Sequence, residues 1–166
     1  MRIIGIDPGY AIVGFGVVDY EKTRFTTIEY GAVLTDAGTP FVDRLGEIFR
    51  DLTTVLERTK PEAMGIEKLF FNTNQKTGID VAQARGVILL AANLYGIPVF
   101  EYTPLQVKQS VVGYGRAEKA QVMEMTKNIL KLKAIPKPDD TADALAIAIC
   151  HAHTNASSMS RFRIKG

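Results

Sequence analysis

The first sixteen residues, MRIIGIDPGYAIVGFG (1–16), contain the pattern that decides the fold. The apolar run at residues 3–6 predicts a buried strand that ends at Asp7, where a Pro-Gly turn follows. A second apolar run from Ile12 predicts its hairpin partner. This geometry holds one carboxylate at a strand end, where glycines allow another backbone or a ligand to approach. Because aspartate also favours turns, a purely local role for Asp7 is equally compatible with this segment.

The composition is typical of a soluble globular protein with one domain. The 166 residues are 46% hydrophobic and 23% charged, which is enough for a substantial core. No apolar run reaches the roughly 18 residues of a membrane span, and no secretory signal is visible. The single cysteine, Cys150, excludes an internal disulfide and a cysteine-based zinc site. We therefore expect a cytoplasmic protein that does not bind membranes.

Charge is unevenly distributed along the chain, although the formal net charge is only +2. Residues 1–67 carry 7 Lys and Arg against 11 Asp and Glu, whereas residues 68–166 carry 13 against 7. The asymmetry permits a nucleic-acid surface in the second part of the chain but does not require one.

The hydropathy pattern predicts a mixed sheet with helices. The strands expected at residues 3–7, 12–19 and 25–34 are joined by short turns and are therefore antiparallel. Strands expected at 62–67 and 98–103 alternate with helices, which is typical of parallel connections. The expected helices are 40–58, 79–95, 104–112, 117–131 and 140–153, with a loop at 69–77. The prediction is an α/β fold with a mixed five-stranded sheet flanked by helices.

The C-terminal segment is expected to be less ordered than the rest of the chain. We predict one domain at residues 1–154 and a basic, weakly ordered C-terminal tail at 155–166.

Within the domain, the helix at 79–95 is nearly apolar on all sides, whereas packing on a sheet requires only one apolar face. The remaining apolar surface indicates a homodimer contact.

Four acidic residues occupy unusual positions. Asp7 ends the first strand and Glu67 ends the fourth, and adjacent strands would bring them side by side. Asp140 and Asp143 lie three residues apart on one face of the last helix. If that helix packs on the sheet, all four carboxylates converge, which is unfavourable unless a cation such as Mg²⁺ or Mn²⁺ lies among them. Two such ions can activate water and stabilise the leaving oxygen in phosphodiester cleavage.

A structural role remains open for the helix pair. Asp140 could cap the last helix with Asp143 as its capping-box partner, and the helix dipole would favour both. Glu67 has no comparable local role, because an acid that closes an apolar strand has no helix end to cap. His151 and His153, late in the same helix, are expected to be structural.

Five segments together resemble the RuvC family of Holliday junction resolvases: GIDPG (5–9), IEKLFF (66–71), QARGV (83–87), QVKQSVVGYGRAEK (106–119) and DDTADALAIAICHAH (139–153). The resemblance extends over about residues 1–154. It implies an RNase H-like fold and a homodimer that nicks two opposed strands of a four-way DNA junction with magnesium, alongside a branch-migration complex of the RuvA and RuvB type. The catalytic and metal-binding residues implied by these motifs are Asp7, Glu67, Asp140 and Asp143.

The resemblance also implies residues that contact DNA. Lys108 and Lys119 match family lysines near the scissile phosphate, and Phe70 matches a residue that contacts a base at the junction centre. Arg116 is a candidate by position alone, because cations and amides at a helix start suit phosphate binding. Each isolated cation could equally be a solvated side chain on a helix surface.

Three other functions are compatible with parts of the pattern. A nuclease for RNA–DNA hybrids would use the same acids, but would not need the apolar helix as a dimer surface. A junction-binding module without catalysis would gain nothing from a buried negative cluster. A sugar-kinase-like phosphate loop at the Asp-Pro-Gly turn would need a second nucleotide-binding domain, for which 166 residues leave no room.

Overall fold

The structure is a computed structural model that describes residues 1–69, 75–154 and 161–164. A five-stranded sheet in the order β3-β2-β1-β4-β5 forms its centre. The strands are β1 (Arg2–Asp7), β2 (Ile12–Glu21), β3 (Arg24–Leu34), β4 (Ala63–Glu67) and β5 (Val99–Tyr102). The pairs β1–β2 and β2–β3 are antiparallel, whereas β1–β4 and β4–β5 are parallel. The predicted mixed sheet is confirmed.

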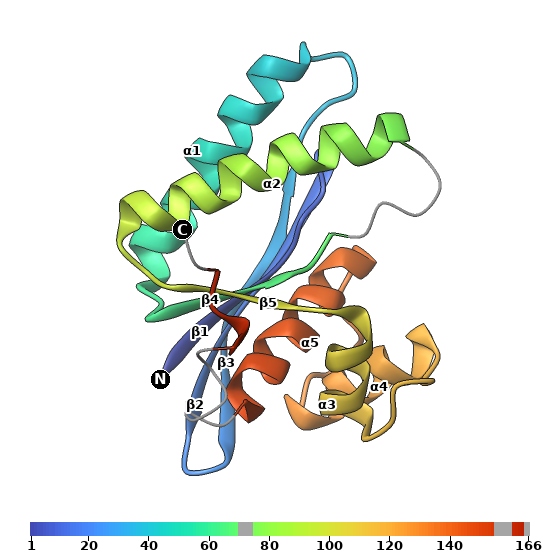
Figure 1. Cartoon of the computed structure of the whole chain (residues 1–166). Coiled ribbons are helices and arrows are strands. Elements are labelled where there is room, and N and C mark those ends of the chain that lie inside the picture. Colours follow the sequence, from blue (N-terminus) through green and yellow to red (C-terminus); the bar gives the residue numbers. More distant parts are fainter. Residues whose placement is uncertain (70–74, 155–160, 165–166) are drawn as a thin grey trace.

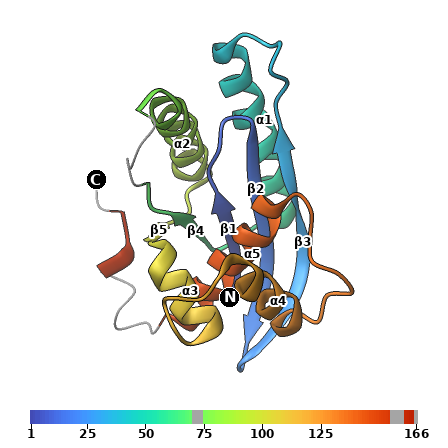
Figure 2. The same cartoon turned by 90° about the vertical axis from the view of Figure 1, so that its right-hand side faces the viewer.

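Helices cover both faces of this sheet, as Figures 1 and 2 show. The helices are α1 (Phe41–Thr59), α2 (Gln75–Tyr95), α3 (Pro104–Val112), α4 (Lys119–Ile129) and α5 (Asp139–His153). On one face, α1 and α2 close a core with Ile4, Ile6 and Ile66 of the sheet. On the other face, α5 packs directly on the sheet, and α3 and α4 pack against α5.

Strand register places the ends of β1 and β4 together. Ile6 of β1 pairs with Ile66 of β4, so that Asp7 and Glu67, the next residues, leave the sheet at the same edge. Asp7 also lies opposite Gly14 of β2. The apolar residues that precede both acids are fully buried, which fixes the position of the two strand ends.

Glycines allow α5 to lie unusually close to the sheet. A Cβ atom on Gly5 would overlap the carbonyl oxygen of Ala144, and one on Gly14 would overlap that of Asp140. The hydroxyl of Thr141 also donates to the carbonyl of Gly31 at 3.1 Å. The first turn of α5 is therefore held against β2 and β3, beside the end of β1.

Several helix boundaries differ from those predicted. The helix α2 begins at Gln75, within the expected loop, because Gln and Lys are good helix formers and Gly78 hides the start of the pattern. The helix α4 is shorter than expected: Glu118 is its N-cap, and Lys131 beyond its end has a positive φ of 53°. The helix α5 begins one residue early, at Asp139.

Part of the expected tail lies against the edge strand β5. The Ile164 amide donates to the Val99 carbonyl at 2.9 Å, and the Phe162 ring lies 5.3 Å from that of Tyr102. This pairing was not visible in the basic composition of the segment. None of the helices in the described residues has the length and apolar character needed to cross a membrane.

Candidate active site

The four predicted acids come from three elements that meet at one edge of the sheet. Asp7 and Glu67 end the parallel neighbours β1 and β4, and Asp140 and Asp143 lie in the first turns of α5. The close approach of α5 to Gly14, the partner of Asp7, brings Asp140 to the same place. Long-range topology thus gathers the residues that the sequence pattern selected.

The electrostatics of this edge are those of a crowded negative cluster. Burial raises the pKa of Asp7 to about 8, with further increases from Glu67, Asp143 and Asp140. Burial, and then the charge of Asp143, also raise the pKa of Glu67. The pKa of Asp143 is raised by burial, although Lys119 acts in the opposite direction. Like charges this close together either bind a proton, as the raised pKa of Asp7 indicates, or are balanced by a cation.

The structure argues against helix capping as the reason for the two acids of α5. The N-cap of α5 is Pro138, and no side chain caps it. Asp140 lies inside the first turn, and Asp143 contacts the lysine of another helix rather than the backbone of its own. The helix dipole still favours Asp140, which lies in the first turn, but neither acid is part of a capping box.

Lys119 supplies a positive charge within the cluster. Its Nζ atom lies 2.9 Å from Oδ2 of Asp143 and 3.8 Å from Oδ2 of Asp139. Lys119 is the first residue of α4, whose start is fixed because the Glu118 amide donates to the Gln121 side chain at 2.9 Å. The same lysine lowers the pKa of Asp7 and of Glu67.

A cavity of about 230 Å³ opens beside these charges. Its polar lining consists of Glu67, Lys108, Lys119 and Asp143. Lys108 reaches it from α3, whose first turn is fixed by reciprocal hydrogen bonds between Thr103 and Gln106. Two acids and two lysines around one opening match a site for a phosphodiester that is held by cations while it reacts.

The remaining predicted DNA contacts stand apart from this cavity. Arg116 is exposed in the turn between α3 and α4 and does not line the cavity. Phe70 falls outside the described residues, so its predicted contact with a base stays a prediction.

The donor set fits a hard divalent cation, because carboxylate oxygens are the ligands that Mg²⁺ and Mn²⁺ prefer. The raised pKa of Asp7 also marks a place where positive charge is deficient. Among the residues that the structure describes, however, no three His, Cys, Asp or Glu side chains lie close enough together to hold one ion. Oδ2 of Asp143 is engaged by Lys119 instead, and an ion bound to Asp143 would compete with that contact.

Both histidines of α5 lie at its far end, and their contacts are structural. His151 is fully buried, with its Nδ1 atom 2.7 Å from the Tyr102 hydroxyl. His153 packs against the rings of Tyr20 and Phe25.

A charged residue that the sequence analysis did not select lies at the site. Asp139 contacts Lys119, and its other carboxylate oxygen is 2.5 Å from Lys137. The only signal in the sequence was the Asp-Asp doublet at 139–140, from which the family motif uses the second residue.

Three antiparallel strands followed by two parallel ones, with acids at the two central strand ends and on the covering helix, define an RNase H-like nuclease fold. The family model described as "Crossover junction endodeoxyribonuclease RuvC" matches residues 3–151. The chain therefore belongs to the RuvC family.

Individual relatives agree with this assignment over nearly the whole chain. The crossover junction endodeoxyribonuclease RuvC of Brevibacillus brevis is 59% identical over 156 residues, which is 94% of each protein. That of Alkaliphilus oremlandii is 52% identical and covers 99% of this chain and 100% of the relative. The structure of Thermus thermophilus RuvC in complex with a Holliday junction substrate superposes with a TM-score of 0.90 at 38% identity, covering 98% of both chains.

Proposed function

We propose that the chain is an endonuclease that resolves four-way DNA junctions by paired, symmetric nicks. The observation that carries this proposal is the partly buried acid cluster beside a lysine-lined cavity, in a chain of the RuvC family. The relative from Thermus thermophilus, whose structure holds a Holliday junction substrate, supports the choice of DNA substrate.

Within this proposal, Asp7, Glu67, Asp140 and Asp143 hold divalent cations. We propose Mg²⁺, for which Mn²⁺ can substitute, and two ions in each site. When bound, such ions activate an attacking water molecule and neutralise the leaving oxygen. Hydrolysis of the phosphodiester would leave 5′-phosphate and 3′-hydroxyl ends.

The cations of the chain would hold the DNA. Lys108 and Lys119 line the cavity, so either ammonium can reach a phosphate that enters it. Arg116, exposed in the turn before α4, would contact the DNA backbone further from the reacting bond. Phe70 would contact a base at the junction centre, as the family motif implies.

We further propose that the active form is a homodimer with α2 at its interface. Ile79, Leu90 and Leu94 of this helix are each at least half exposed. Gly86 lies between them, and a Cβ atom there would meet nothing. Because glycine weakens a helix by about 1 kcal/mol relative to alanine, its presence at an exposed position is consistent with a close helix crossing. Two copies would place two sites on two strands of one junction.

In the cell we place the reaction in recombination and DNA repair. The site would act in the cytoplasm on junctions that a branch-migration complex of the RuvA and RuvB type delivers. The family relationship supports this context.

Cleavage of a labelled synthetic four-way junction tests the proposed function, with linear duplex and an RNA–DNA hybrid as controls. We expect symmetric, Mg²⁺-dependent nicks at the junction and no cleavage of either control. Cleavage of the hybrid would favour the alternative nuclease, and junction binding without cleavage would favour the binding module. As a test of the dimer, Leu90→Glu should produce a monomer in sedimentation and abolish paired nicking.

A further inference from the structure

The side chain of Lys119 lies between two carboxylates of α5. Its Nζ atom is 2.9 Å from Oδ2 of Asp143 and 3.8 Å from Oδ2 of Asp139. Asp143 lines the cavity and belongs to the proposed metal-binding set, whereas Asp139 does neither. Binding of a metal ion would therefore affect the contact of Lys119 with Asp143 but not its contact with Asp139.

A divalent cation bound to Asp143 would weaken the contact between Oδ2 of Asp143 and the ammonium of Lys119, because the two positive charges repel each other at this distance. Asp143 is only about a quarter exposed, so its carboxylate has little room to serve both charges at hydrogen-bond distance. An ion that takes Asp143 therefore displaces Lys119, and a displaced ammonium keeps its place only if a second anion holds it. Asp139 is already in contact, and a movement of about 1 Å would bring Lys119 to hydrogen-bond distance from it.

The surroundings of Asp139 suit this task. The residue begins α5, so the backbone of the helix fixes its position. Its Oδ1 atom accepts from Lys137 at 2.5 Å, which leaves Oδ2 directed to Lys119. With a side chain 44% exposed, Asp139 can exchange partners without leaving a buried charge unpaired.

We propose that Asp139 is a positioning residue that holds the Lys119 ammonium beside the cavity when a divalent cation takes Asp143. In the resting protein Lys119 occupies the place of the missing positive charge. With the ion bound, Lys119 turns to Asp139 and remains within reach of a phosphate in the cavity. This inference rests on the proposed function, because it requires Asp143 to be a metal ligand.

A different role for Asp139 would be to attract the cation through its charge alone. That role does not depend on Lys119, so the two can be separated by measuring the effect of Asp139→Asn with and without the lysine. The matched control is Glu124→Gln, which removes one acidic charge from the exposed surface of α4, where Glu124 pairs with Lys127.

The experiment is a Mn²⁺ titration, followed by electron paramagnetic resonance, of the wild-type protein, Lys119→Gln, Asp139→Asn and the double variant. We expect Lys119→Gln to tighten Mn²⁺ binding about fivefold, because the competitor is gone. Asp139→Asn should weaken it about threefold, because the displaced lysine has no partner. In the Lys119→Gln protein, Asp139→Asn should have less than a twofold effect, and Glu124→Gln none.

A second readout follows the lysine itself. For junction cleavage at saturating Mg²⁺, Asp139→Asn should lower kcat several-fold at unchanged KM, and Asp139→Glu should restore most of the loss. Equal weakening of Mn²⁺ binding by Asp139→Asn with and without Lys119 would overturn the positioning role alone. Absence of Mn²⁺ binding to the wild-type protein would overturn the proposed metal site, and the role of Asp139 with it.

Discussion

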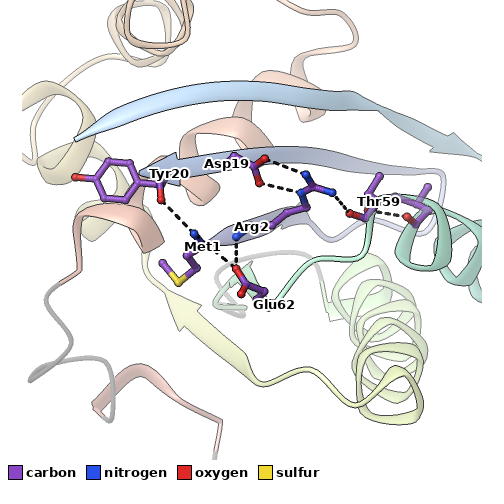
Figure 3. A network of polar contacts seen from close by, with 7 residues as sticks. Met1, Arg2, Asp19, Tyr20, Thr59 and Glu62 are labelled. Carbon is purple, nitrogen blue, oxygen red and sulfur yellow. Dashed lines mark hydrogen bonds and ion pairs between the residues drawn. The ribbon is translucent and has the colours of Figure 1, made fainter. Parts of the chain in front are cut away.

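The two ends of β1 carry charged clusters of opposite design. At the start of the strand, the guanidinium of Arg2 makes two hydrogen bonds to Asp19, at 2.8 and 2.9 Å, and a third to the carbonyl of Thr59 at 2.7 Å (Figure 3). The amide of Arg2 also donates to Glu62, just before β4. Every charge in this network has a partner, and Arg2 lowers the pKa of Asp19.

At the other end of the same strand, the charges are alike. Asp7 is partly buried beside three further carboxylates, and the charge of Lys119 opposes theirs. The same parallel pair, β1 and β4, lies between the two clusters, so both are attached to one part of the sheet. The difference lies in the side chains. At the start of β1, opposite charges stabilise the fold, whereas at its end, acids of like charge form a site that favours binding of a cation.

The largest effect should come from removing the central acid. Asp7→Asn should reduce junction cleavage on the order of 1,000-fold or more, because a ligand of the proposed ions is lost. Junction binding should persist or tighten, because repulsion of the DNA phosphates falls. Cleavage kinetics and a gel-shift assay measure the two effects. Asp43→Asn, at an exposed position in α1, is the matched control. Cleavage at the wild-type rate by Asp7→Asn would contradict the site.

The acid cluster at the end of β1 should also make the stability of the protein depend on pH. The pKa of Asp7 is about 8 in the folded protein but 3.8 for an ordinary aspartate in water, so the folded state binds a proton that the unfolded state lacks between these values. Without divalent cations, stability should therefore fall as pH rises from about 4 to 8, by several kcal/mol. Thermal unfolding in EDTA measures this slope. Asp7→Asn should flatten it, and an unchanged slope would show that another group is responsible.

The close packing of α5 on the sheet can be broken without changing a charge. Gly14→Ala would force a methyl group against the carbonyl of Asp140, which should cost about 1–3 kcal/mol and move the first turn of α5. Cleavage should fall further than the loss of stability explains. Gly46→Ala, inside α1, where a methyl group meets only the flexible end of Arg50, should leave cleavage close to wild type and raise stability by up to about 1 kcal/mol, because alanine favours the helix. Chemical denaturation and cleavage assays would compare the two.

The charged cluster around Arg2, at the start of β1, should affect stability and not cleavage. Arg2→Gln removes the contacts to Asp19 and Thr59 and should destabilise the fold by about 1 kcal/mol, because the side chains are partly exposed. Junction cleavage by the folded protein should not change. A loss of cleavage that exceeds the loss of folded protein would mean that the two ends of β1 are not independent.

Much of this arrangement could be predicted from the sequence. The hairpin at residues 1–16 and the alternation of helices and strands indicated the sheet, and acids at two strand ends indicated the site. The pairing of β1 with β4, on which the convergence of Asp7 and Glu67 depends, followed from the order of the elements.

Other features depend on packing that no local pattern records. Tertiary packing determines the start of α2 at Gln75 and the pairing of Ile164 with Val99, because the hydropathy pattern of both segments has only weak periodicity. The position of Asp139 beside Lys119 depends on how α4 lies against α5. Single-residue contacts between helices that are distant in sequence cannot be derived from the spacing of residues within either one.

The most direct test of the contrast between the two ends is thermal unfolding with and without 10 mM Mg²⁺, measured for the wild-type protein, Asp7→Asn and Arg2→Gln. We predict that Mg²⁺ stabilises the wild-type protein and Arg2→Gln by the same increment, and that it leaves Asp7→Asn unchanged. Equal stabilisation of Asp7→Asn would contradict the central claim that the acids at the end of β1 form the cation site.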